Sequence, residues 1–313
     1  MRIIFIGTGE IGVPTLRALQ QSEHELVGVV TQLGKAAGRD QRIKEPTIKK
    51  AIAESSIPIL QPKHIKDRKS LEEIRALQPD VIVVMAYGQI LSRALLEIPR
   101  LACLNLHASL LPRWRGAAPI QAAIAAGDRQ TGITVIYMDE GLDTGDIFLQ
   151  CKIDISPTDT GGSLHDQLAR VAPEALLESL RSLSSASAPR IPQNNALATH
   201  APKLNRADGE IDWSESAEVI ERKIRAFNPW PGAFTNVWNG QHQRSLKLKI
   251  FSAAPMSEIK REPGALIHAA DDGLVFATGK GALAVGEVQL EGKQRMSAGE
   301  FVRGHRWIAH PIR

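Results

Sequence analysis

Short apolar runs alternate with amphipathic segments over the first 183 residues of the chain. Runs around Ile4, Val29, Val83 and Leu104 have the length of strands, and the stretches between them carry apolar residues at helical spacing. The continuous run VIVVM at 81–85 is typical of a strand buried on both faces. Strands and helices in this alternation predict a Rossmann-like α/β fold with a doubly wound, mostly parallel sheet. The predicted strands cover residues 3–6, 26–31, 57–60, 81–85, 101–107, 134–138 and 147–155, and the predicted helices cover 13–21, 45–54, 70–77, 117–125 and 163–183.

The pattern changes after residue 183. Residues 184–206 are rich in Ser, Ala, Pro and Asn and have no sustained period, so we expect a linker there. Residues 207–313 begin with a helical pattern at 217–227 and continue as short strands separated by turn residues. These strands are expected at 233–238, 246–253, 264–268, 273–277 and 282–289. Their spacing predicts a small OB-like β-barrel as a C-terminal domain at 207–313, after an N-terminal domain at 1–183.

The first expected strand is followed by GTGEIG, a complete G-x-G-x-x-G at Gly7, Gly9 and Gly12. In a dinucleotide-binding turn, an acidic residue at the end of the second strand holds the ribose hydroxyls. The second strand of this chain ends in Thr31 and Gln32 instead. We therefore interpret the three glycines as a tight strand-to-helix turn, and we expect no NAD.

Composition narrows the class of protein. The 313 residues carry a net charge of +4, a mildly basic balance that favours a polyanionic partner without identifying one. Cys103 and Cys151 have neither metal-ligand nor disulfide spacing, so we expect buried thiols in a reducing, cytoplasmic location. No apolar run approaches the roughly 18 residues that a membrane span needs, so no membrane partner is expected.

Polar side chains collect at the ends of two expected strands. Asn105 and His107 are two residues apart, so they leave the same face near the edge where open α/β sheets place ligands. MDEGLDTGDIF at 138–148 follows another strand and carries four carboxylates, Asp143 among them. An imidazole held by a carboxylate, with an amide donor beside it, suits acyl-type transfer. A structural histidine and an acidic surface turn are the plainer alternatives.

These residues belong to longer patterns. NLHASLLPRWRGAAPI at 105–120 closely resembles the signature of the methionyl-tRNA formyltransferases, and DEGLDTGD at 139–146 resembles their second motif at the expected separation. KLN at 203–205 and GEIDW at 209–213 resemble the entrance to the second domain of that family. The Asn-x-His…Asp core is shared by all folate-dependent formyltransferases, whereas RWRGAAPI, LDTGD and the second domain point to enzymes that act on tRNA.

The resemblance implies the formyltransferase fold and a direct formyl transfer. By similarity, the α-amino group of methionine on initiator tRNA attacks the formyl group of 10-formyltetrahydrofolate through a tetrahedral intermediate. Asn105 and protonated His107 would stabilise the oxyanion, and Asp143 would support His107 and help to take up the proton. No metal is needed, because the attacked carbon belongs to an activated amide. The product would be formylmethionyl-tRNA for translation initiation, and the enzyme is expected to be a monomer.

The resemblance to the family also implies which residues bind the formyl donor. The resemblance implies that the formyl-folate site is lined by Ser109, Leu110, Leu111 and Pro112. The stretch 86–91 would offer backbone groups and apolar walls to the pterin.

A basic stretch at 31–50 stands where a long loop is expected. Such a run is commonly a solvated face. In the family it contacts the acceptor end of initiator tRNA, so Lys35, Arg39 and Arg42 are expected to bind tRNA phosphates and to make binding salt-dependent. The C-terminal domain would contact the tRNA body.

The chain departs from the family pattern at two places. Gly9 stands where the family has proline, which is what creates the G-x-G-x-x-G, and Leu33-Gly34 replaces the usual Pro-Asp. The second change bears on tRNA discrimination.

Three other functions stay open. A formyltransferase acting on a nucleotide sugar or on glycinamide ribonucleotide would share the catalytic residues but not RWRGAAPI or the second domain. An NAD-dependent oxidoreductase would need the acid that is missing after the second strand. A non-catalytic RNA-binding protein would have no use for Asn105, His107 and Asp143.

Overall fold

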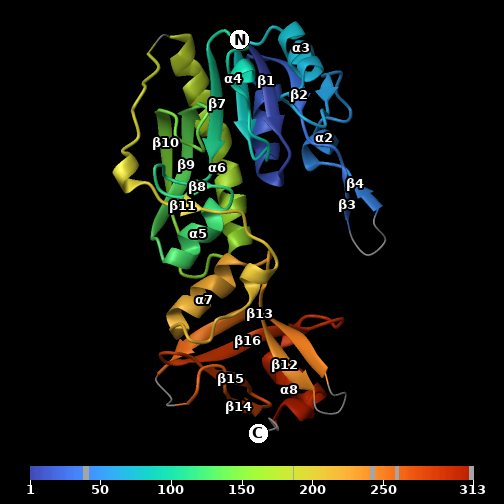
Figure 1. Ribbon diagram of the computed structural model, residues 1–313, viewed down its shortest axis with the longest axis vertical. Helices are drawn as coiled ribbons and strands as arrows, with labels where there is room; N and C mark the ends of the chain where they lie inside the picture. Colours follow the sequence, from blue (N-terminus) through green and yellow to red (C-terminus); the bar gives the residue numbers. More distant parts are fainter. Residues whose placement is uncertain (38–41, 186, 240–243, 258–260, 310–313) are drawn as a thin grey trace. The chain divides into compact units, whose positions relative to one another are not determined.

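The computed structural model describes residues 1–37, 42–185, 187–239, 244–257 and 261–309 (Figure 1). Its contacts divide the chain into two units. The first comprises residues 1–119, 130–154 and 165–202, and the second comprises 120–129, 155–164 and 203–313. Within the described ranges, none of the helices combines the length and the apolar composition that crossing a membrane requires.

The first unit is built on one sheet with the strand order β10-β9-β7-β6-β1-β2-β5. Its strands are β1 (Arg2–Gly7), β2 (Glu25–Val30), β5 (Ile59–Leu60), β6 (Val81–Met85), β7 (Ala102–His107), β9 (Gln130–Tyr137) and β10 (Ile147–Asp154). Along the row β7-β6-β1-β2-β5, every neighbouring pair of strands is parallel. Strand β9 runs antiparallel to both β7 and β10. The predicted Rossmann-like, mostly parallel sheet is therefore confirmed.

Helices cover both faces of this sheet. They are α1 (Val13–Gln20), which follows the short 3-10 turn η1 (Glu10–Gly12), together with α2 (Thr47–Ala51), α3 (Arg68–Ala76), α4 (Arg93–Leu96) and α6 (Gly161–Ser184). Ile4 and Ile6 of β1 pack in one cluster with Ile74 of α3 and Leu95 of α4. Phe5 points to the opposite face, where Gly12 lies against its ring. The central strands are thus buried on both faces, as the apolar run at 81–85 predicts.

Gly7 and Gly12 of GTGEIG are explained by close packing of the turn after β1. A Cβ on Gly7 would stand 2.6 Å from the Phe5 ring and 2.8 Å from Met85 O. A Cβ on Gly12 would stand 3.1 Å from the same ring. Space therefore accounts for glycine at these positions.

The second unit contains an antiparallel sheet with the order β12-β13-β16-β15-β14, and β17 pairs with β16. Its elements are α5 (Pro119–Ala126, shared with the first unit), α7 (Ala217–Ala226), β12 (Ala233–Asn239), β13 (Arg244–Met256), β14 (Leu266–Ala270), β15 (Gly273–Ala277), β16 (Ala282–Leu290), β17 (Met296–Ser297) and α8 (Ala298–Gly304). Register shifts between Ile250 and Ala253 interrupt the pairing of β13 with β16, as bulges do where a sheet curls. Leu248, Phe276 and Phe301 lie in its core. The predicted OB-like domain is confirmed as a curled antiparallel sheet.

Candidate active site

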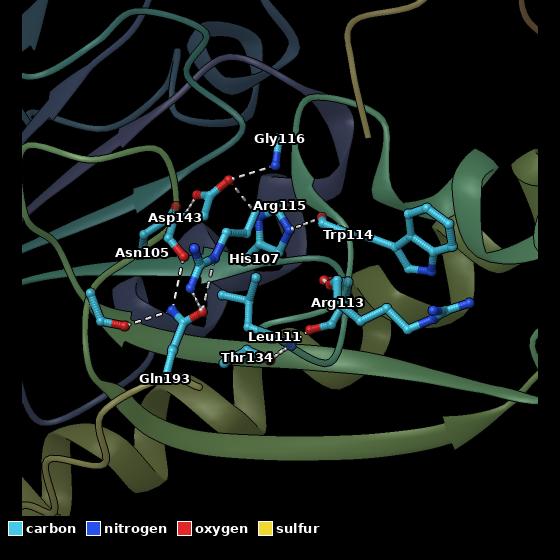
Figure 2. Close-up of polar contacts among 12 residues, drawn as sticks. Asn105, His107, Leu111, Arg113, Trp114, Arg115, Gly116, Thr134, Asp143 and Gln193 are labelled. Carbon is cyan, nitrogen blue, oxygen red and sulfur yellow. Dashed lines mark hydrogen bonds and ion pairs between the residues drawn. The ribbon is translucent and has the colours of Figure 1, made fainter. Parts of the chain in front are cut away.

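Strand β7 carries Asn105 and His107 to one end of the sheet. It pairs in parallel with β6 and antiparallel with β9, and His107 is its last residue. Because side chains alternate along a strand, Asn105 and His107 project from one face and Leu106 from the other. The loop between β9 and β10 adds Asp143 to the same cluster, as Figure 2 shows.

The three predicted catalytic side chains are in contact. Asn105 Nδ2 donates to Asp143 Oδ1 over 3.3 Å, and His107 Nδ1 lies 3.5 Å from Asp143 Oδ2. The side chain of His107 is 6% exposed and that of Asp143 is 14% exposed. Charges in such poorly hydrated surroundings interact more strongly than at the surface. The structure therefore brings together polar groups that the sequence places on two separate segments.

A backbone carbonyl fixes the orientation of the His107 ring. His107 Nε2 lies 2.8 Å from Trp114 O, so Nε2 carries a hydrogen and donates it to that oxygen. Nδ1 then faces Asp143, and a bare ring nitrogen against a bare carboxylate oxygen would be repulsive. A protonated ring would instead place its positive charge beside the carboxylate, 3.5 Å away. The geometry therefore suits an imidazolium paired with Asp143.

The backbone presents the Asp143 carboxylate to this cluster. Asp143 has φ +55°, a left-handed conformation that is uncommon for residues other than glycine and is often found at functional sites. Its Oδ2 accepts a hydrogen bond from the N–H of Gly116 over 2.9 Å. Earlier in the same loop, Asp139 accepts from Thr144 Oγ1 over 2.7 Å. The Asp139 carboxylate therefore stabilises the loop that carries Asp143.

Residues 190–201, here called the active-site strap, contact the first residue of β10 and the strand β8 (Arg115–Gly116). Ile191 and Ile147 exchange two backbone hydrogen bonds at one end. At the other end, β11 (His200–Ala201) pairs in parallel with β8 (Arg115–Gly116). The sequence predicts a linker at 184–206 and no contact with the site, because the partners of this segment are side chains and a two-residue strand, which produce no periodic pattern.

The loop expected to line a folate site is anchored mainly by buried atoms. Ser109 is fully buried, and its carbonyl oxygen accepts from Thr134 Oγ1 over 2.6 Å. Leu111 is 3% exposed, and its N–H donates to the same hydroxyl over 3.1 Å. Leu110 and Pro112 are partly exposed, so these two side chains have surface available to a ligand. The lining role of the whole loop stays a prediction.

The loop at 86–91 follows β6, the parallel neighbour of β7, and lies at the same edge of the sheet. The Gln32 side chain donates to Tyr87 O and holds this loop. Gly88 has φ +80° and an exposed backbone, and Ile90 is 84% exposed. Tyr87 is buried instead, and this burial raises the pKa of its hydroxyl to about 12.

The basic stretch folds in part as a hairpin where a long loop was expected. Strands β3 (Lys35–Ala37) and β4 (Arg42–Lys44) pair antiparallel, with Lys35 opposite Lys44 and Ala37 opposite Arg42. Figure 1 shows this hairpin extending from the rest of the first unit. Arg39 lies outside the described residues. The hairpin concentrates basic residues on two short strands, and their contact with tRNA stays a prediction.

Cys103 and Cys151 are both free thiols. Cys103 is buried on β7, and burial raises the pKa of its thiol to about 12, so the thiol stays protonated at neutral pH. Cys151 is partly exposed, so the predicted burial is wrong for this cysteine. Across the part of the chain that the structure describes, no group of three or more His, Cys, Asp or Glu is placed to hold a metal ion.

The chain matches two family models and full-length relatives. Residues 1–180 match the formyl transferase model, and residues 203–306 match the formyl transferase C-terminal domain. The chain is 47% identical to the methionyl-tRNA formyltransferase of Akkermansia muciniphila, over 97% of this chain and 97% of that protein. It is 46% identical to the methionyl-tRNA formyltransferase of Methylacidiphilum infernorum, over 98% of this chain and 96% of that protein.

A solved structure shares the fold. WlaRD is a sugar 3N-formyl transferase whose crystal structure was determined in the presence of dTDP and 5-N-formyl-THF. It superposes with a TM-score of 0.67 at 17% identity, covering 94% of this chain and 99% of that chain. The resemblance that the sequence motifs predict is thus confirmed: the chain belongs to the formyltransferase family, and both relatives described above are methionyl-tRNA formyltransferases.

Proposed function

We propose that this chain transfers the formyl group of 10-formyltetrahydrofolate to the α-amino group of methionine on initiator methionyl-tRNA. The observation that carries the proposal is the convergence of Asn105, His107 and Asp143 in a chain 47% identical to a methionyl-tRNA formyltransferase over its length. A sugar or ribonucleotide acceptor would use the same three groups. The curated relatives that match both parts of the chain favour methionyl-tRNA.

The cluster has the groups that a direct transfer needs. As the amine attacks the formyl carbon, negative charge develops on the formyl oxygen. Asn105 Nδ2 gives one N–H to Asp143 and has a second to give to that oxygen. When His107 carries a proton on Nδ1 as well as on Nε2, its positive charge stabilises the same negative charge. Asp143 is placed to accept the proton that the amine loses, and as the bond between the formyl carbon and N10 of the donor breaks, that proton passes to N10.

The formyl donor is a substrate, and two loops fit it. A pterin ring needs hydrogen-bonding groups at its edge and apolar contacts on its faces. The exposed backbone at Gly88 and the exposed Ile90 supply both kinds of surface at the edge of the sheet where β7 ends. Leu110 and Pro112 add partly exposed apolar side chains. The donor supplies an activated formyl carbon.

The tRNA is proposed to bind through its phosphates. Lys35, Arg39 and Arg42 would meet the acceptor end, and residues 207–313, as the C-terminal domain, would contact the tRNA body. We further propose that the enzyme acts as a monomer in the cytoplasm, in keeping with free cysteines and a bacterial initiator tRNA as substrate.

The test is transfer of labelled formyl groups from 10-formyltetrahydrofolate by wild type and His107→Ala. Initiator methionyl-tRNA, elongator methionyl-tRNA and free methionine serve as parallel acceptors. We expect labelling of the initiator tRNA alone, with the rate greatly reduced in the variant. Consumption of the donor without labelled tRNA would point to another acceptor, and the absence of any turnover would refute the proposal.

A further inference from the structure

Arg115 and Gln193 form a polar contact within the first unit, between β8 and the active-site strap (Figure 2). Arg115 is 5% exposed, so its guanidinium needs partners within the protein. Its Nη2 donates to Gln193 Oε1 over 2.7 Å, and its Nε donates to the same oxygen over 3.1 Å. Nη2 also donates to Asn195 Oδ1 over 2.8 Å. The carbonyl end of Gln193 is therefore fixed by Arg115.

The amino end of the same side chain holds the loop that carries Asp143. Gln193 Nε2 donates to Asp143 O over 2.8 Å and to Gly145 O over 2.7 Å. The loop has little freedom on its other side, because a Cβ on Gly145 would stand 1.6 Å from Tyr137 O. The backbone on both sides of Thr144 is thus held between β9 and Gln193.

A primary amide of this length meets both demands at once. Arg115 can only donate hydrogen bonds, and the two loop carbonyls can only accept them. Glutamine offers one acceptor oxygen and an NH₂ group with two hydrogens, one for each carbonyl. A glutamate would satisfy Arg115 but repel the carbonyl oxygens. A leucine would leave the buried guanidinium with fewer partners and the carbonyls with none from this side chain.

We propose that Gln193 is a positioning residue for formyl transfer. Braced by Arg115, it holds Asp143 in its left-handed conformation and so keeps the carboxylate against Asn105 and His107. The inference rests on the proposed function and extends it to a residue outside both catalytic segments. Displacement of a reacting group by about 1 Å can lower a rate by about 100-fold, so such a brace has a measurable effect.

The experiment compares Gln193→Glu and Gln193→Leu with wild type and with Gln130→Leu. Gln130 is a matched control, because it is an exposed glutamine of the same unit whose Nε2 donates to the Asp154 carboxylate over 2.9 Å. In formylation of initiator methionyl-tRNA, we expect both Gln193 variants to lose roughly 10- to 100-fold in kcat. KM for donor and tRNA should stay within about threefold, and the pH dependence of kcat should move.

Two readouts separate positioning from a merely structural role. Gln193→Glu keeps the acceptor for Arg115 and adds an opposite charge beside it, which offsets the repulsion from the two carbonyls, so its thermal midpoint should stay close to that of wild type. Amide hydrogen exchange over residues 139–146 should be faster in both Gln193 variants than in wild type and the control. If Gln193→Glu retains wild-type kcat, or if exchange is unchanged in both variants, the proposal is overturned. Hydrogen exchange can be measured without turnover. It therefore tests whether Gln193 holds the Asp143 loop even if wild type does not formylate tRNA and the proposed function is wrong.

Discussion

The N–H of Gly116 and the carboxylate of Asp143 are joined by a hydrogen bond of 2.9 Å. Gly116 has φ +118°, and a Cβ there would stand 2.6 Å from Ala201 O on the paired strand β11. The residue that fixes one oxygen of this carboxylate therefore has no room for a side chain. The strap and the site are therefore coupled at this backbone position as well as through Gln193.

We expect Gly116→Ala to lower both stability and activity. The left-handed conformation alone costs about 1–2 kcal/mol for an alanine, and the contact with Ala201 O would move the donor away from Asp143. Gly292→Ala is the control, since Gly292 has φ +76° but a Cβ there would meet nothing within 4 Å. Urea unfolding and formylation rates measure both effects. A Gly116 variant with the kcat of wild type would contradict the coupling.

Asp143→Asn should keep the hydrogen bond from Gly116 but lose the acceptor for Asn105 and the negative charge. The amide oxygen of asparagine can still accept from Gly116, but it carries no charge and takes up no proton at neutral pH. We expect kcat to fall by about 10²- to 10⁴-fold, with KM for both substrates within about threefold. Asp154→Asn, at a surface carboxylate, is the control. A loss of less than about tenfold would show that another group takes the proton.

Tyr87→Phe is expected to be neutral or slightly stabilising. The Tyr87 hydroxyl is buried and has no hydrogen-bond partner among the described residues, so its removal should change the free energy of unfolding by less than about 1 kcal/mol. Urea unfolding at pH 7 measures this. A loss above that value would show that the hydroxyl makes a stabilising contact.

The same variant tests an alkaline pH dependence. Burial raises the pKa of Tyr87 to about 12, whereas the unfolded chain releases this proton near pH 10. Between these values the native state binds more protons than the unfolded state, so the contribution of Tyr87 to stability falls as pH rises through this window. The free energy of unfolding of wild type should therefore fall more steeply above pH 10 than that of Tyr87→Phe. Equal slopes would contradict the assignment.

Arg42→Glu should weaken tRNA binding without impairing the chemistry. Each phosphate contact that is lost lowers the slope of log Kd against log salt by about 0.7 to 0.9. We expect a weaker Kd for tRNA, a smaller salt slope and an unchanged kcat at saturating tRNA. Lys69→Glu on α3, where Lys69 is exposed beside Glu73, is the charge-matched control. Equal Kd values for the two variants would contradict a contact between the hairpin and tRNA.

Much of the fold could be predicted because buried strands and helices carry apolar residues at regular spacings along the sequence. The run at 81–85 coincides with β6, and the strand expected at 273–277 coincides with β15. The helix expected at 45–54 is shorter, Thr47–Ala51, because Pro46 stands at its start and Ile52 leaves the helical region. Helix α8 was missed, since seven residues show little period, although Ser297 and Glu300 form a capping box there.

Some residues of the candidate site could also be predicted from the sequence, and others could not. Asn105 and His107 could be singled out because their spacing of two on a strand puts them on one face. Asp143 could be paired with them only through the resemblance, because a loop has no sequence periodicity from which its conformation could be predicted. Gln193 could not be found at all. Its partners Arg115 and Asp143 are 78 and 50 residues away in sequence, and no local pattern reports such contacts.

Single-turnover formylation of initiator methionyl-tRNA by wild type and Asn105→Ala tests the central claim most directly. The claim is that the cluster on β7 and the Asp143 loop performs the transfer. We expect wild type to form formylmethionyl-tRNA and the variant to lose about 10²- to 10³-fold in rate, as for removal of an oxyanion donor, with tRNA binding unchanged. Transfer by the variant at the wild-type rate would contradict the claim.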